Sequence, residues 1–438
     1  ELLENSISKE HASNEHQLIV ISCNNTLNEN LTADRIHYLC WKGKGPNTRR
    51  IGVFELTYFL HYNGGVSVHI YYKALNLKNG RIHQDTFIVD EYLDGKLYIR
   101  ISYTDDIVPD VHLHSQSGPV TNISTSVDHI LKVVTIKVEK PEKGKWDITV
   151  STKNSKRNDL EIFISSTTAN SVPITISAKA SDRYYHGEHR VAVFAEVSLG
   201  HHPVLGLKVT ATVQTDVTKG FHTDLYDNGS GADIQRDDGI YSRFMPYYQD
   251  EPGLKIVIEV ADPLHSGHVM KTDDIGDYDY KFTKIPLRHG VNRVTAIHPY
   301  LNHIVRRSVS NGIPPARIQN LKLLHVVNAD RSISLEFTAV GEDLDHGTAH
   351  HYELYYAHTS RDILDNKDAL KLVKRVQQEH LISGSIQFPR PSGYTEVFRI
   401  NSTALAPNKR SFAFVILVVD KDGNKGEMSN MVTAGFLS

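Results

Sequence analysis

The sequence predicts a mainly β protein of tandem antiparallel β-sandwiches, with a partial α/β segment at the N-terminus. Two observations predict the β part: short alternating or continuous apolar runs recur after residue 85, and Gly, Pro and Asp turns separate them. A third predicts the α/β part. The stretch "RIGVFELTYFLHYN" spaces its apolar residues as a helix does, ends at Gly64-Gly65 and precedes the strand-like "VSVHIYY".

With 438 residues the chain is too long for a single hydrophobic core, so we expect several domains. The two prolines of "NGIPPARIQNLKLL" mark a stiff entry into the last of them. The expected division is a partial α/β segment (1–84), a β-sandwich (85–171), a second β-sandwich with an acidic loop and a linker (172–310), and a C-terminal sandwich domain (311–438).

Charge and hydropathy argue against nucleic-acid binding and against a membrane-spanning helix. The net charge of -3 gives no concentrated basic face, so we expect no nucleic-acid partner. No apolar run approaches the ~18 residues of a membrane-spanning helix, so we expect no transmembrane segment. The chain begins with Glu1 rather than Met and carries no signal peptide, which indicates a processed or partial chain.

Sequons and cysteines bear on the compartment. Asn-x-Ser/Thr sequons predict N-glycosylation at Asn24, Asn30, Asn122 and Asn401; the fifth, at Asn228, lies in a crowded turn that disfavours a glycan. The two cysteines, Cys23 and Cys40, can form a disulfide in an oxidising compartment, or remain two buried thiols. We expect an extracellular protein, secreted or peripherally associated with the cell surface.

The most chemically loaded stretch is "TDLYDNGSGADIQRDDGIYSRF", from Thr223 to Phe244. Its glycines allow the backbone to fold tightly, and calcium takes six to eight oxygen ligands. The candidate calcium ligands are Asp227, Asn228, Asp233, Asp237 and Asp238. The spacing matches no known calcium loop, and aspartates also stabilise turns by accepting bonds from their own backbone. An ion-free connection between two strands is therefore the favoured alternative to bound calcium.

Enzymatic motifs are missing from the sequence. Zinc proteolysis by the HExxH motif needs two histidines one helical turn apart with a glutamate between them, and no HExxH occurs. The run "DRSIS" (330–334) matches a metal-dependent adhesion signature, but it lies in a predicted hairpin rather than before a helix. No catalytic residue is assigned, and we expect a non-enzymatic chain.

Two resemblances are carried by quoted motifs. "SLEFTA" and "LAPNKRSFAF" resemble the second strand and the Leu-x-Pro corner of a fibronectin type III domain, with Phe337 and Phe412 where that fold usually has tryptophan and tyrosine. "LYDNGSGADIQRDDGIYSRF", "IPPARIQNLKLL" and "GEDLDHGTAHHYELYYAHTSRDILD" are similar to the C-terminal half of the calcium-activated chloride channel regulator family. Residues 1–84 look like the end of the von Willebrand type A domain that precedes the β-domains in that family.

The family resemblance implies a secreted or cell-surface glycoprotein that modulates calcium-activated chloride conductance. It also implies a zinc-metalloprotease domain and a metal-dependent adhesion site upstream of Glu1. We therefore expect an interaction module whose partners are proteins at the cell surface or in the matrix, a chloride channel among them.

Two alternatives stay open. In the first, the chain is the released C-terminal fragment of a self-cleaving zinc metalloprotease. In the second, it is a carbohydrate-binding β-sandwich with a sugar platform of aromatic residues (Tyr241, Phe244, Tyr247 and Tyr248).

Overall fold

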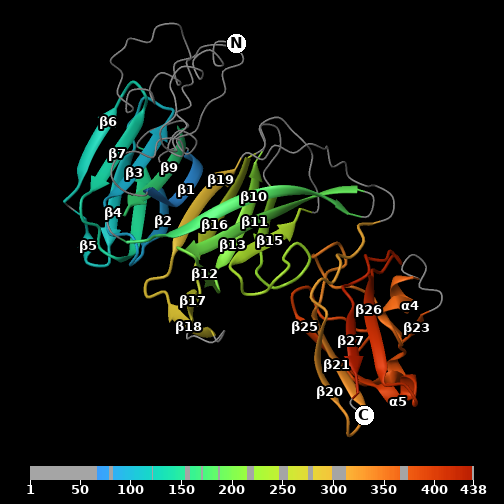
Figure 1. Cartoon of the computed structure of the whole chain (residues 1–438). Helices are drawn as coiled ribbons and strands as arrows, with labels where there is room; N and C mark the ends of the chain where they lie inside the picture. Colours follow the sequence, from blue (N-terminus) through green and yellow to red (C-terminus); the bar gives the residue numbers. More distant parts are fainter. Residues whose placement is uncertain are drawn as a thin grey trace, which may run out of the picture. The chain divides into compact units, whose positions relative to one another are not determined.

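The computed structural model describes residues 67–436 except 78–81, 121, 153–157, 169–170, 186–187, 215–220, 246–254, 275–279, 298–311 and 366–372. The described chain is mainly β, as predicted, and its sheets are built from antiparallel ladders such as β10–β11 and β22–β26 (Figure 1). It divides into two compact units: unit 1 comprises 1–87 and 93–171, and unit 2 comprises 88–92 and 172–438. No helix among the described residues has the length and hydropathy needed to span a bilayer.

Unit 1 contains two sheets with the strand orders β1-β9-β3-β7-β6 and β2-β8-β4-β5. Alternation in the sequence sets which residues face inward: in β8 every second residue from Gly144 to Val150 is buried. Trp146 is 1% exposed and stacks on Phe87 of the neighbouring strand at 5.9 Å. The strands are β1 (Ser67–Leu77), β2 (Ile82–Val89), β3 (Leu97–Tyr103), β4 (Asp110–Ser115), β5 (Gly118–Pro119), β6 (Ser124–Asp128), β7 (Val133–Val138), β8 (Gly144–Ser151) and β9 (Asn158–Thr167).

The expected α/β segment at the N-terminus is not confirmed. The helical stretch and Gly64-Gly65 lie outside the described residues. The strand that follows them, β1, pairs antiparallel with β9 from Ser67↔Thr167 to Leu77↔Asn158. Residues 67–77 therefore belong to an antiparallel sheet of unit 1.

Unit 2 begins with a central sandwich formed by β10–β19. One sheet has the order β10-β11-β12-β17-β18, with β15 paired to β11, and the other has the order β14-β13-β16-β19. Its strands are β10 (Ile174–Tyr185), β11 (Glu188–Leu199), β12 (His202–Leu205), β13 (Lys208–Gln214), β14 (Phe221–Leu225), β15 (Ile240–Phe244), β16 (Lys255–Ala261), β17 (His268–Asp274), β18 (Tyr280–Pro286) and β19 (Asn292–Ile297).

A buried ion pair anchors the segment 88–92 in unit 2. Arg293 Nη1 of β19 lies 2.6 Å from Asp90 Oδ2, with both side chains 1% exposed. Arg293 Nε also donates to the carbonyl of Ile174, at 2.7 Å. Removal of either partner would leave a buried charge uncompensated, which typically costs about 3–5 kcal/mol.

The C-terminal sandwich, also in unit 2, has sheets in the orders β20-β21-β25-β24 and β23-β22-β26-β27. Phe337 of β21 is 1% exposed and makes edge-to-face contacts with Tyr352 and Phe398, each at 5.2 Å. Its elements are β20 (Lys322–Val327), β21 (Ser332–Thr338), β22 (His351–Ala357), α4 (Ser360–Leu364), β23 (Lys374–Arg375), η2 (Gln378–His380), β24 (Leu381–Ser383), β25 (Thr395–Asn401), α5 (Ser402–Leu405), β26 (Ser411–Val419) and β27 (Val432–Gly435).

The corner around Leu405 keeps a tyrosine hydrogen bond despite Phe412. Tyr356 of β22 donates its hydroxyl to the carbonyl of Leu405, at 3.0 Å. Phe412 itself is fully buried, with its ring 6.3 Å from that of Tyr356. The donor to the corner thus comes from a strand distant in sequence.

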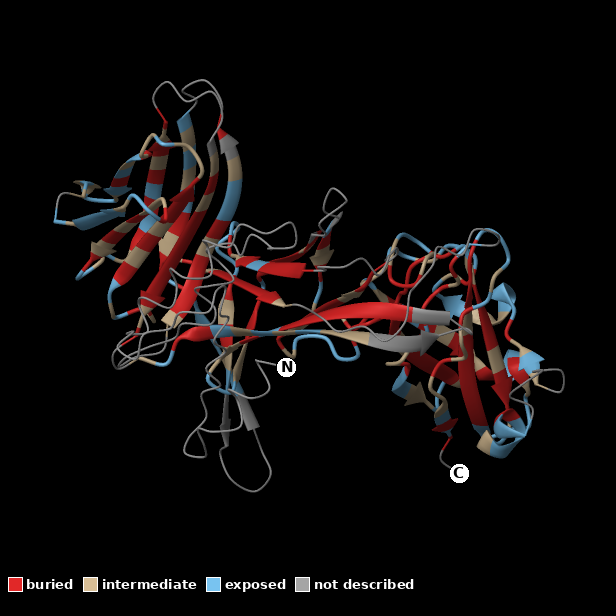
Figure 2. Ribbon diagram, turned by 90° about the horizontal axis from the view of Figure 1, so that it is seen from above, coloured by how far each residue is buried: buried red, intermediate tan, exposed pale blue. Residues whose placement is uncertain are grey.

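Strand β11 is buried on both faces over its middle. Val191, Val193, Ala195 and Val197 point into the core of the central sandwich, whereas Ala192 and Phe194 join the core of the C-terminal sandwich. Figure 2 shows the buried residues running along the long strands of this region. The continuous apolar run "VAVFAEV" reflects this two-sided burial.

Candidate functional site

The acidic loop, residues 226–239, connects β14 to β15 in the central sandwich. Four of its residues have positive φ: Gly229 (72°), Gly231 (62°), Asp237 (61°) and Gly239 (82°). Glycine adopts this conformation at little steric cost, which explains three of the four residue types. The tight backbone directs amide N–H groups inward, where side-chain carboxylates accept them.

Three aspartates of the loop gather on these amides. Asp227 Oδ2 accepts a hydrogen bond from the N–H of Gly239 at 2.8 Å, and Asp238 Oδ1 accepts one from Ile240 at 2.9 Å. Asp233 Oδ2 accepts bonds from the N–H groups of Asn228 and Gly229. One carboxylate oxygen from each of Asp227, Asp233 and Asp238 lies within 4.8 Å of the others.

The other two predicted calcium ligands lie outside this group. Asn228 uses its Oδ1 to accept the N–H of Ser230 at 3.0 Å. Asp237 is exposed at its positive-φ position. The structure thus brings together three of the five residues.

Burial shifts the acidity of the grouped carboxyls. It raises the pKa of Asp227 to about 6 and the pKa of Asp233 to about 7, and it raises the pKa of Asp238. The backbone hydrogen bonds of Asp227 and Asp233 oppose the shift, and the neighbouring carboxylates add to it. A cation at this position would remove most of that penalty, because it would favour the charged forms.

The group fits a hard cation in its chemistry. Three carboxylates supply oxygen ligands, while backbone carbonyls and water would have to complete the six to eight that calcium takes. It does not fit catalytic zinc, which is bound through imidazole nitrogen or thiolate sulfur in most protein sites. Within the described residues this is the one group of three or more His, Cys, Asp or Glu side chains with ligand atoms this close.

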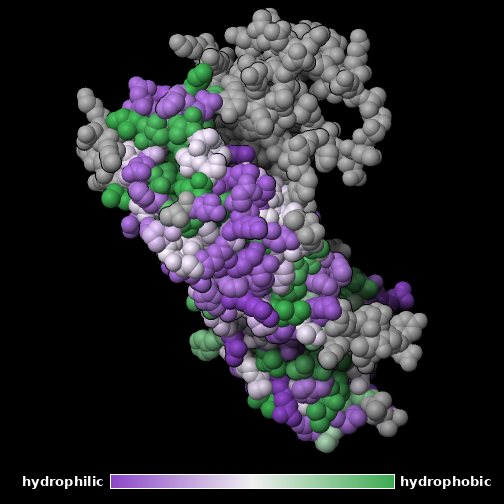
Figure 3. All heavy atoms as spheres, turned by 90° about the vertical axis from the view of Figure 1, so that its left-hand side faces the viewer, coloured by the Kyte–Doolittle hydropathy of each residue, from purple (hydrophilic) through white to green (hydrophobic). Residues whose placement is uncertain are grey.

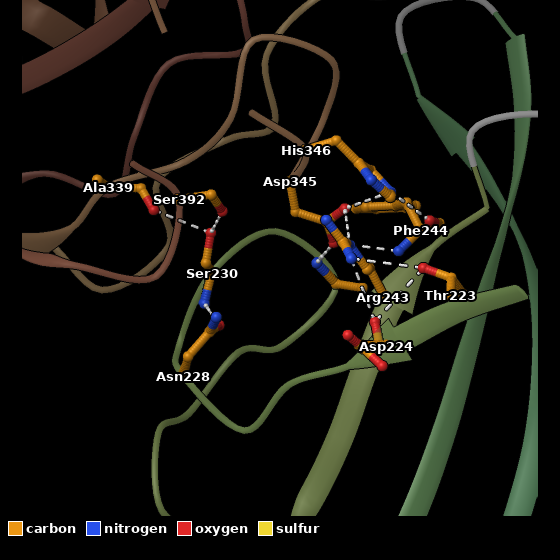
Figure 4. Close-up of polar contacts among 11 residues, drawn as sticks. Thr223, Asp224, Asn228, Ser230, Arg243, Phe244, Ala339, Asp345, His346 and Ser392 are labelled. Atoms are coloured by element: carbon orange, nitrogen blue, oxygen red, sulfur yellow. Dashed lines mark hydrogen bonds and ion pairs between the residues drawn. The ribbon is translucent and has the colours of Figure 1, made fainter. Parts of the chain in front are cut away.

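The rest of the loop is bonded to the C-terminal sandwich (Figure 4). Asp345 Oδ2 accepts hydrogen bonds from the backbone N–H groups of Phe244, at 3.0 Å, and Ala232, at 3.3 Å. Asp345 is 5% exposed, and burial raises the pKa of its carboxyl to about 6. Its other oxygen faces Arg243 Nε at 3.9 Å.

His346 forms a hydrogen bond to the other backbone group of Phe244. Its Nε2 lies 2.9 Å from the carbonyl oxygen of Phe244, so that Nε2 carries the proton and donates it. Burial lowers the pKa of His346 to about 4, which makes the ring neutral near pH 7. The backbone of Phe244 is therefore bonded through both its N–H and its C=O.

Further bonds fix the tip of the acidic loop. Ser230 Oγ donates to the carbonyl of Ala339 at 2.9 Å and lies 2.9 Å from Ser392 Oγ. Figure 4 shows Ser230 between these two partners. The carbonyls of Gly229 and Gly231 accept from Asn320 Nδ2 and Gln319 Nε2, each at 3.0 Å, and Arg236 Nη1 donates to Thr395 Oγ1 at 3.0 Å.

This set of contacts, which we call the joint, is what the sequence did not reveal. The acidic stretch supplies one side of it, and "IPPARIQN" and "GEDLDHG" supply Gln319, Asn320, Asp345 and His346 on the other. Ala232 and Phe244 also enter the hydrophobic core of the C-terminal sandwich. The glycines and aspartates of the acidic stretch and of "GEDLDHG", and the Gln-Asn pair of "IPPARIQN", were a cue to polar contacts, but nothing in the sequence showed that they meet.

The remaining candidates are placed as follows. Asn122 is exposed, and Asn401 is half-buried with its Oδ1 capping α5 through the N–H groups of Thr403 and Ala404. Tyr241 and Phe244 are 3% and 5% exposed, so neither contributes to a sugar platform. Asn24, Asn30, Cys23, Cys40, Tyr247 and Tyr248 lie outside the described residues.

Comparison with known proteins gives consistent relatives. Human calcium-activated chloride channel regulator 1 is 26% identical over 397 residues, which cover 84% of this chain and 42% of that protein. Human regulator 4 is 24% identical, with 83% and 41% covered, and human regulator 2 is 25% identical, with 58% and 28% covered. The chain therefore spans about two fifths of the length of regulators 1 and 4.

No protein-family model matches the chain. Among solved structures, the propeptide form of the Bacillus licheniformis lipase BlEst2 aligns over 51% of this chain and 45% of its own. Its TM-score is 0.26 at 8% identity, so it carries no argument. Several distinct calcium-activated chloride channel regulators match this chain, two of them over more than four fifths of its length, so the comparisons support its similarity to that family.

Proposed function

We propose that this chain is a non-enzymatic, extracellular interaction module that modulates chloride conductance or mediates adhesion through protein contacts. The observation that carries the proposal is the joint. Its buried polar groups bind backbone atoms and hold two sandwiches together, which is the work of a scaffold. The relatives are named regulators of calcium-activated chloride channels, which supports the conductance role.

Exposed aromatic residues offer contact points beside the joint. Phe388 is 83% exposed and Tyr394 is 57% exposed, in the loop that also carries Ser392. Aromatic and arginine side chains dominate the binding energy of protein interfaces, and Arg390 lies between the two aromatics. Figure 3 shows hydrophobic residues interspersed with hydrophilic ones on one face of the molecule.

The test applies the purified chain to cells that carry a calcium-activated chloride current. We expect whole-cell recording to show a larger current than in buffer-treated cells, and Phe388→Ser to weaken the effect. The matched control is Ile130→Ser, which replaces a hydrophobic residue of unit 1 that is 71% exposed. A current unchanged by the chain at every concentration would contradict the proposal.

The protease alternative predicts a different result. A zinc peptidase would cleave peptide substrates in a reaction abolished by a chelator. We expect no such cleavage by this chain with zinc added. Chelator-sensitive turnover would contradict the non-enzymatic assignment while leaving the contact role of the sandwiches open to the current measurement.

Calcium binding by the acidic loop is a second proposed function. It is favoured by the convergence of Asp227, Asp233 and Asp238 and by the raised pKa values of their carboxyls. Binding to the folded state alone stabilises a protein, by about 2.7 kcal/mol when calcium is at 100 times its dissociation constant. We therefore expect millimolar calcium to raise the melting temperature of the chain.

Matched variants distinguish the carboxylates that would bind calcium from an aspartate of the same loop that would not. Asp227→Asn and Asp238→Asn each remove a grouped carboxylate, and we expect either to abolish most of the calcium-dependent rise. Asp237→Asn removes a charge from the same loop, outside the group, at a positive φ that asparagine tolerates. It should keep the rise. An unchanged melting temperature of the unsubstituted chain would refute the calcium site.

A further inference from the structure

A polar face of unit 1 carries metal-binding side chains in an alternating pattern. Strand β4, "DVHLHS", exposes Asp110, His112 and His114, while Leu113 between the histidines is buried. Alternate residues of a strand point to one face of the sheet, so both imidazoles project from the same face, two residues apart.

The neighbouring strand β8 adds a carboxylate to that face. In the antiparallel ladder His114 lies directly opposite Asp147, and His112 lies opposite Thr149. Directly opposed Cβ atoms are about 4.5–5.5 Å apart, and the diagonal from Asp147 to His112 is within reach of long side chains. Asp147 and His112 are both exposed, and Trp146 and Ile148 beside Asp147 are buried.

Open space adjoins His114 and Asp147. A hollow of about 500 Å³ over the strands of this sheet is lined by Gln84, Asp85, Thr86, His114, Asp147 and Thr149. Its lining is polar, with an imidazole, two carboxylates, an amide and two hydroxyls. Such a hollow leaves room for an ion, its water ligands and a further polar group.

We propose that His112, His114 and Asp147 form a surface site for a divalent transition-metal ion, of which zinc is the best fit. Two imidazole nitrogens and one carboxylate oxygen are a donor set that zinc takes, and a water or an added ligand occupies the fourth tetrahedral position. Calcium and magnesium prefer all-oxygen sets, so this site discriminates against them.

The ligand atoms of His112, His114 and Asp147 do not lie within 4.8 Å of one another in this structure, so binding requires side-chain rotation. His112 Nε2 contacts Asp110 at 3.4 Å, and Asp147 contacts Lys145 at 3.7 Å. The side chains of these pairs are between 46% and 62% exposed, and exposed ion pairs contribute only about 0–1 kcal/mol. Rotation of His112 and Asp147 toward the ion therefore loses little ion-pair free energy. Asp110 can then accept a hydrogen bond from the second ring N–H of His112, as carboxylates beside metal-bound histidines do.

The experiment is zinc titration of the full chain by isothermal calorimetry, in a background of millimolar calcium. The variants are His112→Asn, His114→Asn and Asp147→Asn. His129→Asn is the matched control, because His129 is an exposed histidine of the same unit that follows β6 of the other sheet. All four positions are exposed, and circular dichroism checks that each variant keeps its strand content.

The expected result is zinc binding that each of the three variants weakens by at least about tenfold, since loss of even an outer-shell partner costs roughly 10–100-fold. His129→Asn should bind as the unsubstituted chain does. The proposal is overturned if the unsubstituted chain takes up no zinc at millimolar concentration. It is also overturned if any of the three variants binds zinc as tightly as the unsubstituted chain.

Discussion

At the residue scale, Asp345 is the side chain on which the joint depends most. A single carboxylate oxygen accepts two backbone N–H groups from the central sandwich, in a position 5% exposed. An unpaired buried amide costs about 1–3 kcal/mol, so two of them outweigh most single contacts in the region. Asp345 was visible in the sequence as one more acidic turn residue.

The first prediction concerns pH. Burial raises the pKa of Asp345 to about 6 from 3.8, so the folded state holds its proton more tightly than the unfolded chain. The contribution of Asp345 to the free energy of unfolding is then fully present below about pH 4 and is lost as pH rises through about 6. Because a shift of one pKa unit corresponds to about 1.36 kcal/mol, the loss is at most roughly 3 kcal/mol.

Urea unfolding of the unsubstituted chain and of Asp345→Asn between pH 4 and pH 7 measures this effect. Both tryptophans belong to unit 1, whereas 14 of the 21 tyrosines belong to unit 2, so tyrosine fluorescence weights the measurement toward unit 2. Asp345→Asn should show a smaller decline with pH. Equal slopes for the two proteins would contradict the assignment of this titration to Asp345.

At the element scale, the acidic loop works because glycine lets it approach its partners. Gly231 has φ 62°, and a Cβ added there would lie 2.3 Å from Asp345 Cβ. Gly393, on the facing loop, has the same relation to Asn228, with a Cβ placed 2.4 Å from Asn228 Nδ2. Both loops therefore need glycine for contact as well as for conformation.

The second prediction tests the close approach at Gly231. Gly231→Ala should destabilise unit 2 by more than the ~1–2 kcal/mol of a left-handed conformation, because the methyl group also displaces Asp345. Gly423→Ala is the matched control, with φ 84° and no atom within 4 Å of the added Cβ. Urea unfolding and hydrogen exchange of the 240–245 peptide measure the two effects. Similar losses in both variants would contradict a close contact at Gly231.

Some features of the strands, the short helix and the loop could be predicted from the sequence, and others could not. Alternation and turn residues predicted the antiparallel β architecture, because they are local properties of the chain. The cap of α4 shows the limit of such local rules: the N-cap is Thr359, whose side chain accepts the N–H of Asp362, and the adjacent Ser360 is as good a capping residue by type. The grouping of Asp227, Asp233 and Asp238 follows from loop closure over 12 residues, which composition suggested without fixing the members.

The joint could not be predicted because its partners are remote. Asp345 lies 101 residues from Phe244, and Ser230 lies 162 from Ser392. Local patterns carry no information on such pairings. The sequence therefore identified the motifs and the family that they resemble, while the reason for their composition became visible only in three dimensions.

At the scale of the whole molecule, the sequons differ in their surroundings. Asn122 is exposed, and Asn401 is half-buried with its Oδ1 capping α5. Asn228 is half-buried in the joint, against Gly393. A glycan at Asn228 would separate the two sandwiches.

The third prediction is a glycosylation pattern. When the chain is secreted from mammalian cells, Asn122 and Asn401 should carry N-glycans, and Asn228 should not. Mass spectrometry after enzymatic glycan removal identifies the occupied asparagines. Asn122→Gln and Asn401→Gln should each reduce the mass by one glycan, and Asn228→Gln should leave the glycan mass unchanged. A glycopeptide containing Asn228 would contradict a joint that forms before glycosylation.

The joint also restricts how the chain can vary over evolution. The acidic loop meets three separate segments through single backbone and side-chain groups, so its length and glycine positions are fixed by partners up to 162 residues away. A substitution at Ser230 is tolerated most readily beside a compensating change at Ser392 or in the backbone of Ala339. We expect these distant positions to co-vary as one unit, and the exposed residues Phe282 and Ile285 of β18, which take no part in the joint, to vary independently.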